Sequence, residues 1–282
     1  MNKPAKQASQ KAASRAAETP ARGPGRPSAA DSRSVSRASI LRAALRLAKD
    51  TPLQDLSILM VARSMKIAPG LVHYYLGGRD WLTSGVINLF YKELVKNWPE
   101  QTGDWEDDFW IAAKLVYGHF ANYGGVAAYV VSNSRFRIYQ LTAFSDKDWG
   151  VEFLERFAAR VHAAGLPGER SALYAHLLLE FIISTGHATA FHIHPSEHRK
   201  FLEEKTAQLD PQKFPNIFRD RFSPLTIDGS VAFNELCRLF LLGIKTDLAA
   251  VRELNGAAEV PVLPSPIPAR KNPLKRRSSQ AV

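Results

Sequence analysis

The segment from Ser57 to Arg79, SILMVARSMKIAPGLVHYYLGGR, most constrains the fold, because it predicts two short helices joined by a tight turn. Its first half contains four apolar residues at helical spacing, which form one stripe: Ile58, Val61, Ala62 and Met65. Ser57 stands directly before this stripe, where a hydroxyl can cap the first turn of a helix. The small side chain of Ala62 allows a second helix to cross closely.

The second half of the segment predicts another helix, which begins at Pro69. Proline suits the first helical position, where an N–H has no partner within the helix. Val72 and Leu76 are four residues apart and predict the inward face, whereas Pro69, Gly70, His73 and Tyr74 face outward. This pattern fits a helix-turn-helix, whose second helix enters the major groove of DNA. An ordinary helical hairpin with solvated side chains is an equally good interpretation of these residues alone.

A longer ordered pattern runs from Leu56 to Leu82 and contains Val61-Ala62 and then GLVHYYLGGRDWL. It resembles the core motif of the TetR family of one-component bacterial transcriptional regulators. That motif reads approximately as a valine and an alanine, then Gly-x-Leu-Tyr-x-His/Tyr-Phe, a two-residue turn, a lysine and an acidic residue. The chain departs from it at four positions: Leu71 replaces a common threonine, His73 the usual first tyrosine, Leu76 a common phenylalanine and Arg79 the usual lysine.

The resemblance implies an all-α fold with two parts. Residues 37–82 would form a three-helix, helix-turn-helix DNA-binding domain, and residues 83–256 a helical effector-binding and dimerisation domain. By the same resemblance, phosphates would be held by Ser57, Tyr74, Tyr75 and Arg79, and bases would be approached by Pro69, Gly70, Leu71 and His73. A leucine suits a thymine methyl group, and a histidine can form a hydrogen bond to a purine edge.

The net charge of +10 is unevenly distributed along the 282 residues. Residues 1–37 hold eight Lys/Arg against Glu18 and Asp31, and residues 270–282 hold five with no acidic residue. Residues 38–97 hold eight basic and four acidic groups, so that residues 98–269 carry a net charge of −5. Basic ends and a basic motif beside an acidic body indicate that one part of the chain meets a polyanion.

The two ends of the chain lack the large apolar residues that could form a core. We therefore expect residues 1–36 to be a disordered basic arm and residues 257–282 to be a disordered, proline-rich basic tail. Within the arm, ARGPGRP places Arg22 and Arg26 among Gly and Pro and resembles an AT-hook, which would put Arg26 in a minor groove. A flexible basic linker explains this short match equally well.

The rest of the chain shows helical periodicity without strand alternation. The predicted helices are Ser36–Lys49, Arg79–Trp98, Trp105–Tyr123, Val126–Phe136, Asp146–Ala164, Glu169–His192 and Val231–Glu253. Residues 195–227 read as a partly ordered connector. The segments 173–191 and 233–244 are apolar on more than one face, and the resemblance implies that they form a four-helix bundle between the two subunits of a homodimer.

Several aromatic residues lie where the resemblance places an effector pocket. Trp110, Tyr117 and Phe136 are the candidates for contact with an unknown small molecule. Ordinary packing in the core is the more common role for any one aromatic residue at helical spacing.

Other site chemistry has little support in the sequence. A histidine group at positions 187, 192, 194 and 198 has no familiar metal-ligand spacing, because Pro195 breaks the helix, and helix-end histidines are the favoured interpretation. The single cysteine, Cys237, reads as a buried apolar group. No nucleophile, phosphate-loop or paired-acid motif appears, so we expect neither an enzyme nor a cofactor.

These observations lead to one functional hypothesis. The sequence predicts a cytoplasmic transcriptional regulator without a membrane span, which binds a double-stranded DNA operator as a homodimer and acts as a repressor relieved by a small-molecule effector. Two alternatives remain open: an architectural DNA-binding protein that acts through its basic tails, and a helical ligand-binding protein without a DNA function.

Overall fold

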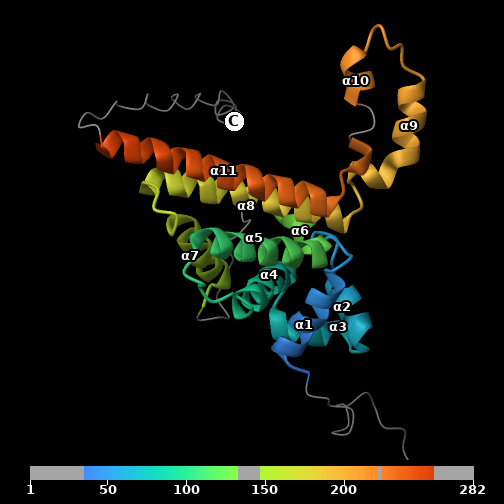
Figure 1. Cartoon of the computed structure of the whole chain (residues 1–282). Helices are drawn as coiled ribbons and strands as arrows, with labels where there is room; N and C mark the ends of the chain where they lie inside the picture. Colours follow the sequence, from blue (N-terminus) through green and yellow to red (C-terminus); the bar gives the residue numbers. More distant parts are fainter. Residues whose placement is uncertain (1–34, 133–146, 221–223, 257–282) are drawn as a thin grey trace, which may run out of the picture. The chain divides into compact units, whose positions relative to one another are not determined.

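The structure, a computed structural model, describes residues 35–132, 147–220 and 224–256, and within these ranges every regular element is helical (Figure 1). This confirms the predicted all-α fold. From Arg37 onward the chain forms one compact unit. Arg22, Arg26, Phe136 and both terminal tails lie outside the described residues, and the domain boundary at 82/83 stays a prediction.

Eleven α-helices and two short 3-10 segments make up the described part of the chain. In order they are α1 (Arg37–Leu47), α2 (Ile58–Met65), α3 (Pro69–Leu76), α4 (Arg79–Lys96), α5 (Trp105–Asn122), α6 (Gly124–Ser132), α7 (Trp149–His162), α8 (Gly168–Ala190), η1 (Pro195–His198), α9 (Arg199–Ala207), α10 (Pro215–Asp220), η2 (Pro224–Thr226) and α11 (Gly229–Gly256).

The first three helices pack around a small apolar core, and we call them the head. Val61 and Ala62 of α2 and Val72 and Leu76 of α3 are all buried, as their spacing predicts. Helix α1 covers this core with a buried apolar face that includes Ile40. It ends at Leu47, two residues earlier than predicted, where a turn begins.

Helix α4 leads from the head to the remaining helices, which we call the body. It packs against α1 on one side and α7 on the other. Gly85 of α4 lies so close to Leu41 of α1 that an added Cβ would come within 2.7 Å of a leucine methyl carbon. A side chain at this position would therefore push the two helices apart.

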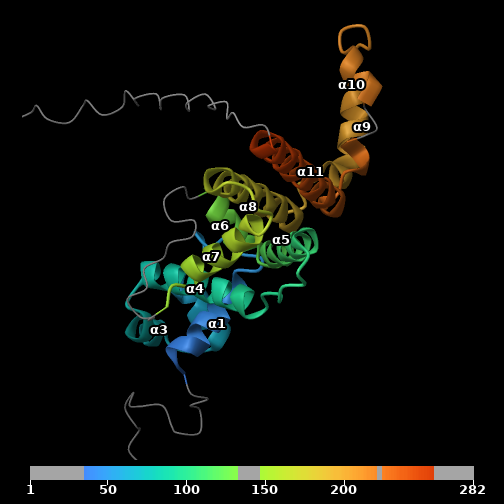
Figure 2. The same ribbon diagram turned by 60° about the vertical axis from the view of Figure 1, so that its left-hand side comes forward.

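Helices α8 and α11 run antiparallel, and Figure 2 shows them beside each other from a second direction. Asp247 of α11 accepts hydrogen bonds from Arg170 (2.5 Å) and Tyr174 (2.9 Å) of α8. Burial and this carboxylate raise the pKa of Tyr174. Cys237 of α11 is buried as predicted, and burial raises the pKa of its thiol to about 12.

One prediction about the body is wrong, and another gains detail. Helix α7 begins at Trp149 and not at Asp146, because Asp148 is the residue whose carboxylate caps it, accepting from the N–H groups of Gly150 and Val151. The segment 195–227, predicted to be a partly ordered connector, contains the short helices α9 and α10 and the two 3-10 segments. Its many helix-breaking residues separate helices that are too short to show a clear apolar periodicity in the sequence.

A buried ion pair connects α5, α7 and the segment between α4 and α5. Asp108 and Arg160 are both nearly inaccessible, with 3.4 Å between Oδ2 and Nη1. The backbone N–H of Thr102 donates to Asp108 at 2.7 Å, and this hydrogen bond is the main cause of the lowered pKa of Asp108.

Among the described residues, no helix has the length and apolar character needed to span a bilayer.

His119 lies at the contact between α4 and α5. Its Nε2 is 3.0 Å from the backbone carbonyl oxygen of Phe90, and the two rings are 4.2 Å apart. Burial lowers the pKa of His119 to about 4. A neutral imidazole can donate to the carbonyl group, so the native structure holds His119 uncharged near neutral pH.

We expect this histidine to make the stability of the protein depend on pH. Between about pH 6.5 and 4, the unfolded chain binds a proton at His119 and the native chain does not. The free energy of unfolding should therefore fall as the pH is lowered through this range, by at most ~1.4 kcal/mol per pH unit for one proton. Urea unfolding of His119→Gln should show a smaller dependence, and the exposed control His162→Gln should match the wild type. Equal pH dependence in all three proteins would contradict this assignment.

Candidate nucleic-acid interface

The turn between α2 and α3 is fixed by backbone hydrogen bonds. Lys66 ends α2 in the left-handed region (φ 56°), and its N–H donates back to carbonyl groups of the last helical turn. The N–H of Ile67 donates to the Ala62 carbonyl at 3.0 Å. Pro69 then occupies the first turn of α3, as predicted. This closed turn sets the angle at which α3 leaves α2.

Ser57 caps α2, which confirms its predicted structural role. Its Oγ accepts a hydrogen bond from the backbone N–H of Met60 at 3.2 Å. Accepting this bond leaves the hydroxyl hydrogen able to donate to a second group. The same side chain can therefore cap the helix and contact a phosphate.

Helix α3 presents the predicted outward face to solvent. Pro69, Gly70 and His73 are exposed, and Tyr74 is 80% exposed. Leu71 and Tyr75 are half-buried. The rings of Tyr74 and Tyr75 meet edge to face at 5.3 Å. The exposed face thus combines a ring nitrogen, a phenol and a bare stretch of backbone on one turn of helix.

The exposed backbone without a side chain is at Gly70, where the fold does not need a glycine. A Cβ added there would meet no atom within 4 Å, and the backbone is not in the left-handed region. Glycine within a helix costs roughly 0.5–1 kcal/mol relative to alanine. An exposed glycine without a structural reason is typical of a place where another molecule approaches the backbone closely.

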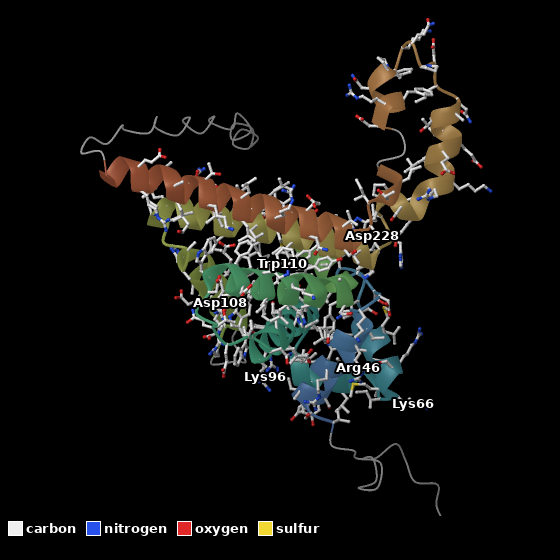
Figure 3. The ribbon with its side chains drawn as sticks, in the orientation of Figure 1. Arg46, Lys66, Lys96, Asp108, Trp110 and Asp228 are labelled. Carbon is white, nitrogen blue, oxygen red and sulfur yellow. The ribbon has the colours of Figure 1, made fainter. Side chains whose placement is uncertain are left out.

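Arg79 has a structural role that its sequence position did not reveal. Its Nη2 donates to the backbone carbonyl of Gln54 in the loop between α1 and α2. The guanidinium group has five N–H donors, so this bond leaves others for a phosphate. Two further exposed cations of the helix-turn-helix, Arg63 and Lys66, were not among the predicted contacts. Figure 3 shows Lys66 at the edge of the head.

A direct backbone contact joins the head to the body at the start of α6. The N–H of Gly125 donates to the Ala48 carbonyl, and the Gly125 carbonyl accepts from the N–H of Leu53, both at 3.0 Å. A Cβ on Gly125 would lie 1.8 Å from the Thr51 carbonyl oxygen. Only glycine therefore allows this contact, which we call the Gly125 junction.

Helix α6 continues from the Gly125 junction into the body. It packs against α5 and α8, and five of its other residues are buried. Gly124 also approaches α8 closely, since an added Cβ would lie 2.8 Å from the Cβ of Ala190. Movement of α6 relative to α8 would thus be transmitted to the end of α1 through the backbone.

Two of the predicted effector residues, Trp110 and Tyr117, lie in an aromatic group between α5 and α11. The ring of Phe233 stacks on Tyr117 at 4.4 Å and lies 5.9 Å from the ring of Trp110. The Tyr117 hydroxyl is 3.0 Å from Thr189 Oγ1, which is 2.9 Å from His194 Nε2. Figure 3 shows Trp110 in this region. The described part of the candidate effector region is therefore an aromatic surface next to a hydrogen-bonded polar chain.

The histidines near the end of α8 interact with different partners. His194 is buried and contacts Thr189, whereas the exposed His192 lies 2.9 Å from a carboxylate oxygen of Glu197. Within the described ranges, no three His, Cys, Asp or Glu side chains are grouped to hold a metal ion.

This arrangement, a three-helix head with an exposed third helix joined by α4 to a helical body, is the fold of TetR-family transcriptional regulators. Apo ActR from Streptomyces coelicolor superimposes with a TM-score of 0.60 at 18% identity, covering 77% of this chain and 98% of that protein. A TetR regulator from the same organism gives a TM-score of 0.59 at 18% identity, with 76% and 99% covered. ActR in complex with actinorhodin gives 0.57 at 20% identity, with 80% and 99% covered.

These similarities establish the fold, which agrees with the resemblance seen in the sequence. No protein-family model matches the sequence, and no curated protein matches it either. The likeness therefore lies in the three-dimensional arrangement of the helices, with few identical residues.

The Gly125 junction makes a prediction about how the head is attached. Gly125→Ala should lower the free energy of unfolding by roughly 2–4 kcal/mol, because it disrupts two hydrogen bonds and forces the backbones apart. Hydrogen exchange should show lost protection at the amides of Leu53 and Gly125. The control Gly118→Ala, in α5, has no atom within 4 Å of the new Cβ and should not destabilise the protein. Wild-type stability of Gly125→Ala with both amides still protected would exclude this role.

Proposed function

We propose that this protein is a ligand-responsive transcriptional regulator, which represses by binding a palindromic DNA operator as a homodimer and is released by a small molecule. The observation that carries the proposal is the face of α3. Its inward residues Val72 and Leu76 are fully buried, and its outward residues are exposed on a fold shared with TetR regulators. The basic ends and basic head agree with a polyanionic partner.

The contacts with DNA follow from the position of each side chain. His73, Gly70, Pro69 and Leu71 would face base edges from the N-terminal part of α3. Tyr74 and Tyr75 would contact phosphates, together with Ser57, Arg79, and the exposed Arg63 and Lys66. In residues 1–34, Arg26 would reach an adjacent minor groove.

The dimer would form through the outward faces of α8 and α11. Leu173, Leu177 and Phe181 are exposed at four-residue spacing on α8, and Leu239 and Leu242 are exposed on α11. Exposed apolar residues grouped on two adjacent helices are typical of a protein interface. A two-fold dimer would present its two α3 helices about 34–36 Å apart, which matches successive major grooves.

Release by an effector would work through the two connections between head and body. ActR has been crystallised with actinorhodin and with (S)-DNPA, so a body of this fold can hold small molecules. A ligand near Trp110 and Tyr117 would shift α5 and α8, and α4 and the Gly125 junction would carry that shift to the head. The ligand would then favour one of two conformers with different spacing of α3. Such a regulator would act in the cytoplasm and needs no cofactor.

Selection of duplexes from a random pool by the full-length protein tests this function. We expect a palindromic consensus whose half-sites are about 10 base pairs apart. Selection with His73→Ala should relax the consensus at the bases that His73 contacts, because phosphate contacts carry no sequence information. Failure of the wild type to enrich any sequence at physiological salt would refute the proposal and favour an architectural or purely ligand-binding role.

Gly70 provides a second prediction, in which stability and DNA affinity change in opposite directions. Gly70→Ala should raise the free energy of unfolding by roughly 0.5–1 kcal/mol, because alanine favours the helix and meets no other atom. It should weaken operator binding on the order of tenfold or more, because the methyl group occupies the space of a base or sugar. The control Gly168→Ala, at the start of α8, also has free space and should leave DNA affinity unchanged. If Gly70→Ala binds operator as tightly as Gly168→Ala does, α3 does not approach DNA closely there.

A further inference from the structure

Helices α9 and α10 leave the body without packing on it. No residue of either helix is buried, although both contain large apolar side chains. Phe201 is 64% exposed, and Phe214 and Ile217 are also exposed. Single helices of nine and six residues are marginal in water without tertiary contacts. We call residues 195–220 the α9–α10 arm.

The base of the arm, by contrast, is firmly held. The Arg199 guanidinium donates to the Leu225 carbonyl at 3.1 Å, and the N–H of Ser196 donates to the Ile227 carbonyl at 3.2 Å. Leu225 itself is buried. The arm therefore starts from a fixed point at the junction of α8 and α11, and its exposed apolar residues are held away from the body.

The charges of the arm do not favour a polyanionic partner. The arm contains five Lys/Arg and five Asp/Glu, so its net charge is zero. Several of these charges already pair along the helices, as Arg199 does with Glu203 (3.7 Å) and Lys200 with Glu204 (3.9 Å). The exposed phenylalanines are what remains for a partner, and they fit an apolar protein surface better than DNA or an anionic membrane.

The position of the arm indicates which protein surface that is. In both views the arm extends from the end of the α8–α11 layer, on the side opposite α5 (Figures 1 and 2). The exposed apolar residues of α8 and α11, such as Phe181 and Leu239, lie on helix faces that the body leaves uncovered. A second copy seated on those faces would lie beside the arm.

We propose that the α9–α10 arm contacts the second subunit of the homodimer, packing Phe201 and Phe214 against the edge of the partner's α8–α11 layer, beside the bundle. This inference rests on the dimer of the proposed function. Helix α9 is about 13 Å long, and a helix is about 10 Å across, so the arm can span the thickness of one helical layer. The two-fold symmetry of a dimer would give two identical arm contacts, each supplied by one subunit to the other.

The first test compares dimer dissociation constants measured by sedimentation equilibrium of the full chain. The double variant Phe201→Ser/Phe214→Ser should raise the dimer dissociation constant on the order of tenfold or more, because two apolar contacts with the partner are lost. The control Val151→Ser, at another exposed apolar residue, on α7, should leave the constant unchanged. Circular dichroism should be native for both variants, since none of these side chains is buried. An unchanged constant for the double variant would overturn the proposal.

A second test locates the contact directly. A photoreactive benzoylphenylalanine is placed at position 201, and chains labelled with light and heavy isotopes are mixed so that cross-links between chains can be distinguished from those within one chain. We expect cross-links from position 201 of one chain to α8 or α11 of the other. Cross-links only within one chain would overturn the proposal, because the arm would then fold onto its own body. Leu177→Ser/Phe181→Ser tests the bundle separately. If that variant dissociates and the arm variant does not, the arm inference fails and the dimer stands; a monomeric wild type refutes both.

Discussion

The contact on which this structure depends is the pair of backbone hydrogen bonds at Gly125. They join the end of α1 and the following loop to the start of α6 with no side chain between them. Backbone groups cannot adopt a new rotamer when a neighbour moves, so this contact is stiffer than one made by long side chains. The orientation of the head is therefore set by the position of α6 in the body.

Helix α4 supplies the second connection, and the two act at different points. Gly85 of α4 lies against Leu41 in the middle of α1, whereas Gly125 holds the end of the same helix. Two separated contacts on one helix fix its direction as well as its position. In a dimer, a small change at either contact would be magnified at α3, which lies farther from the α8–α11 layer. In the proposed dimeric regulator, this would couple movements of the body to the spacing of the two α3 helices.

The sequence predicted the features that depend on local chemistry. The Ser57 cap, the Pro69 helix start and the buried pair Val72 and Leu76 are all set by residues close in the chain. The Gly125 junction and the hydrogen bond from Arg79 to Gln54 join segments that are distant in the sequence, and the neighbouring residues do not indicate either contact. The pair Gly124-Gly125 reads as a helix breaker until α1 is seen beside it. The α9–α10 arm was missed because its helices are too short to show periodicity.

Gly70 and Gly125 differ in whether the fold itself explains why the residue is a glycine. At Gly125 the surrounding backbone leaves no room for a Cβ, so the fold alone explains the glycine. At Gly70 there is room and no unusual φ angle, so the fold offers no explanation and would be more stable with alanine. In the proposed function, the open space next to Gly70 would be occupied by DNA. Since His73 and Tyr74 are exposed on the same helix, insertion of α3 into a DNA groove, as proposed, would account for all three residues together.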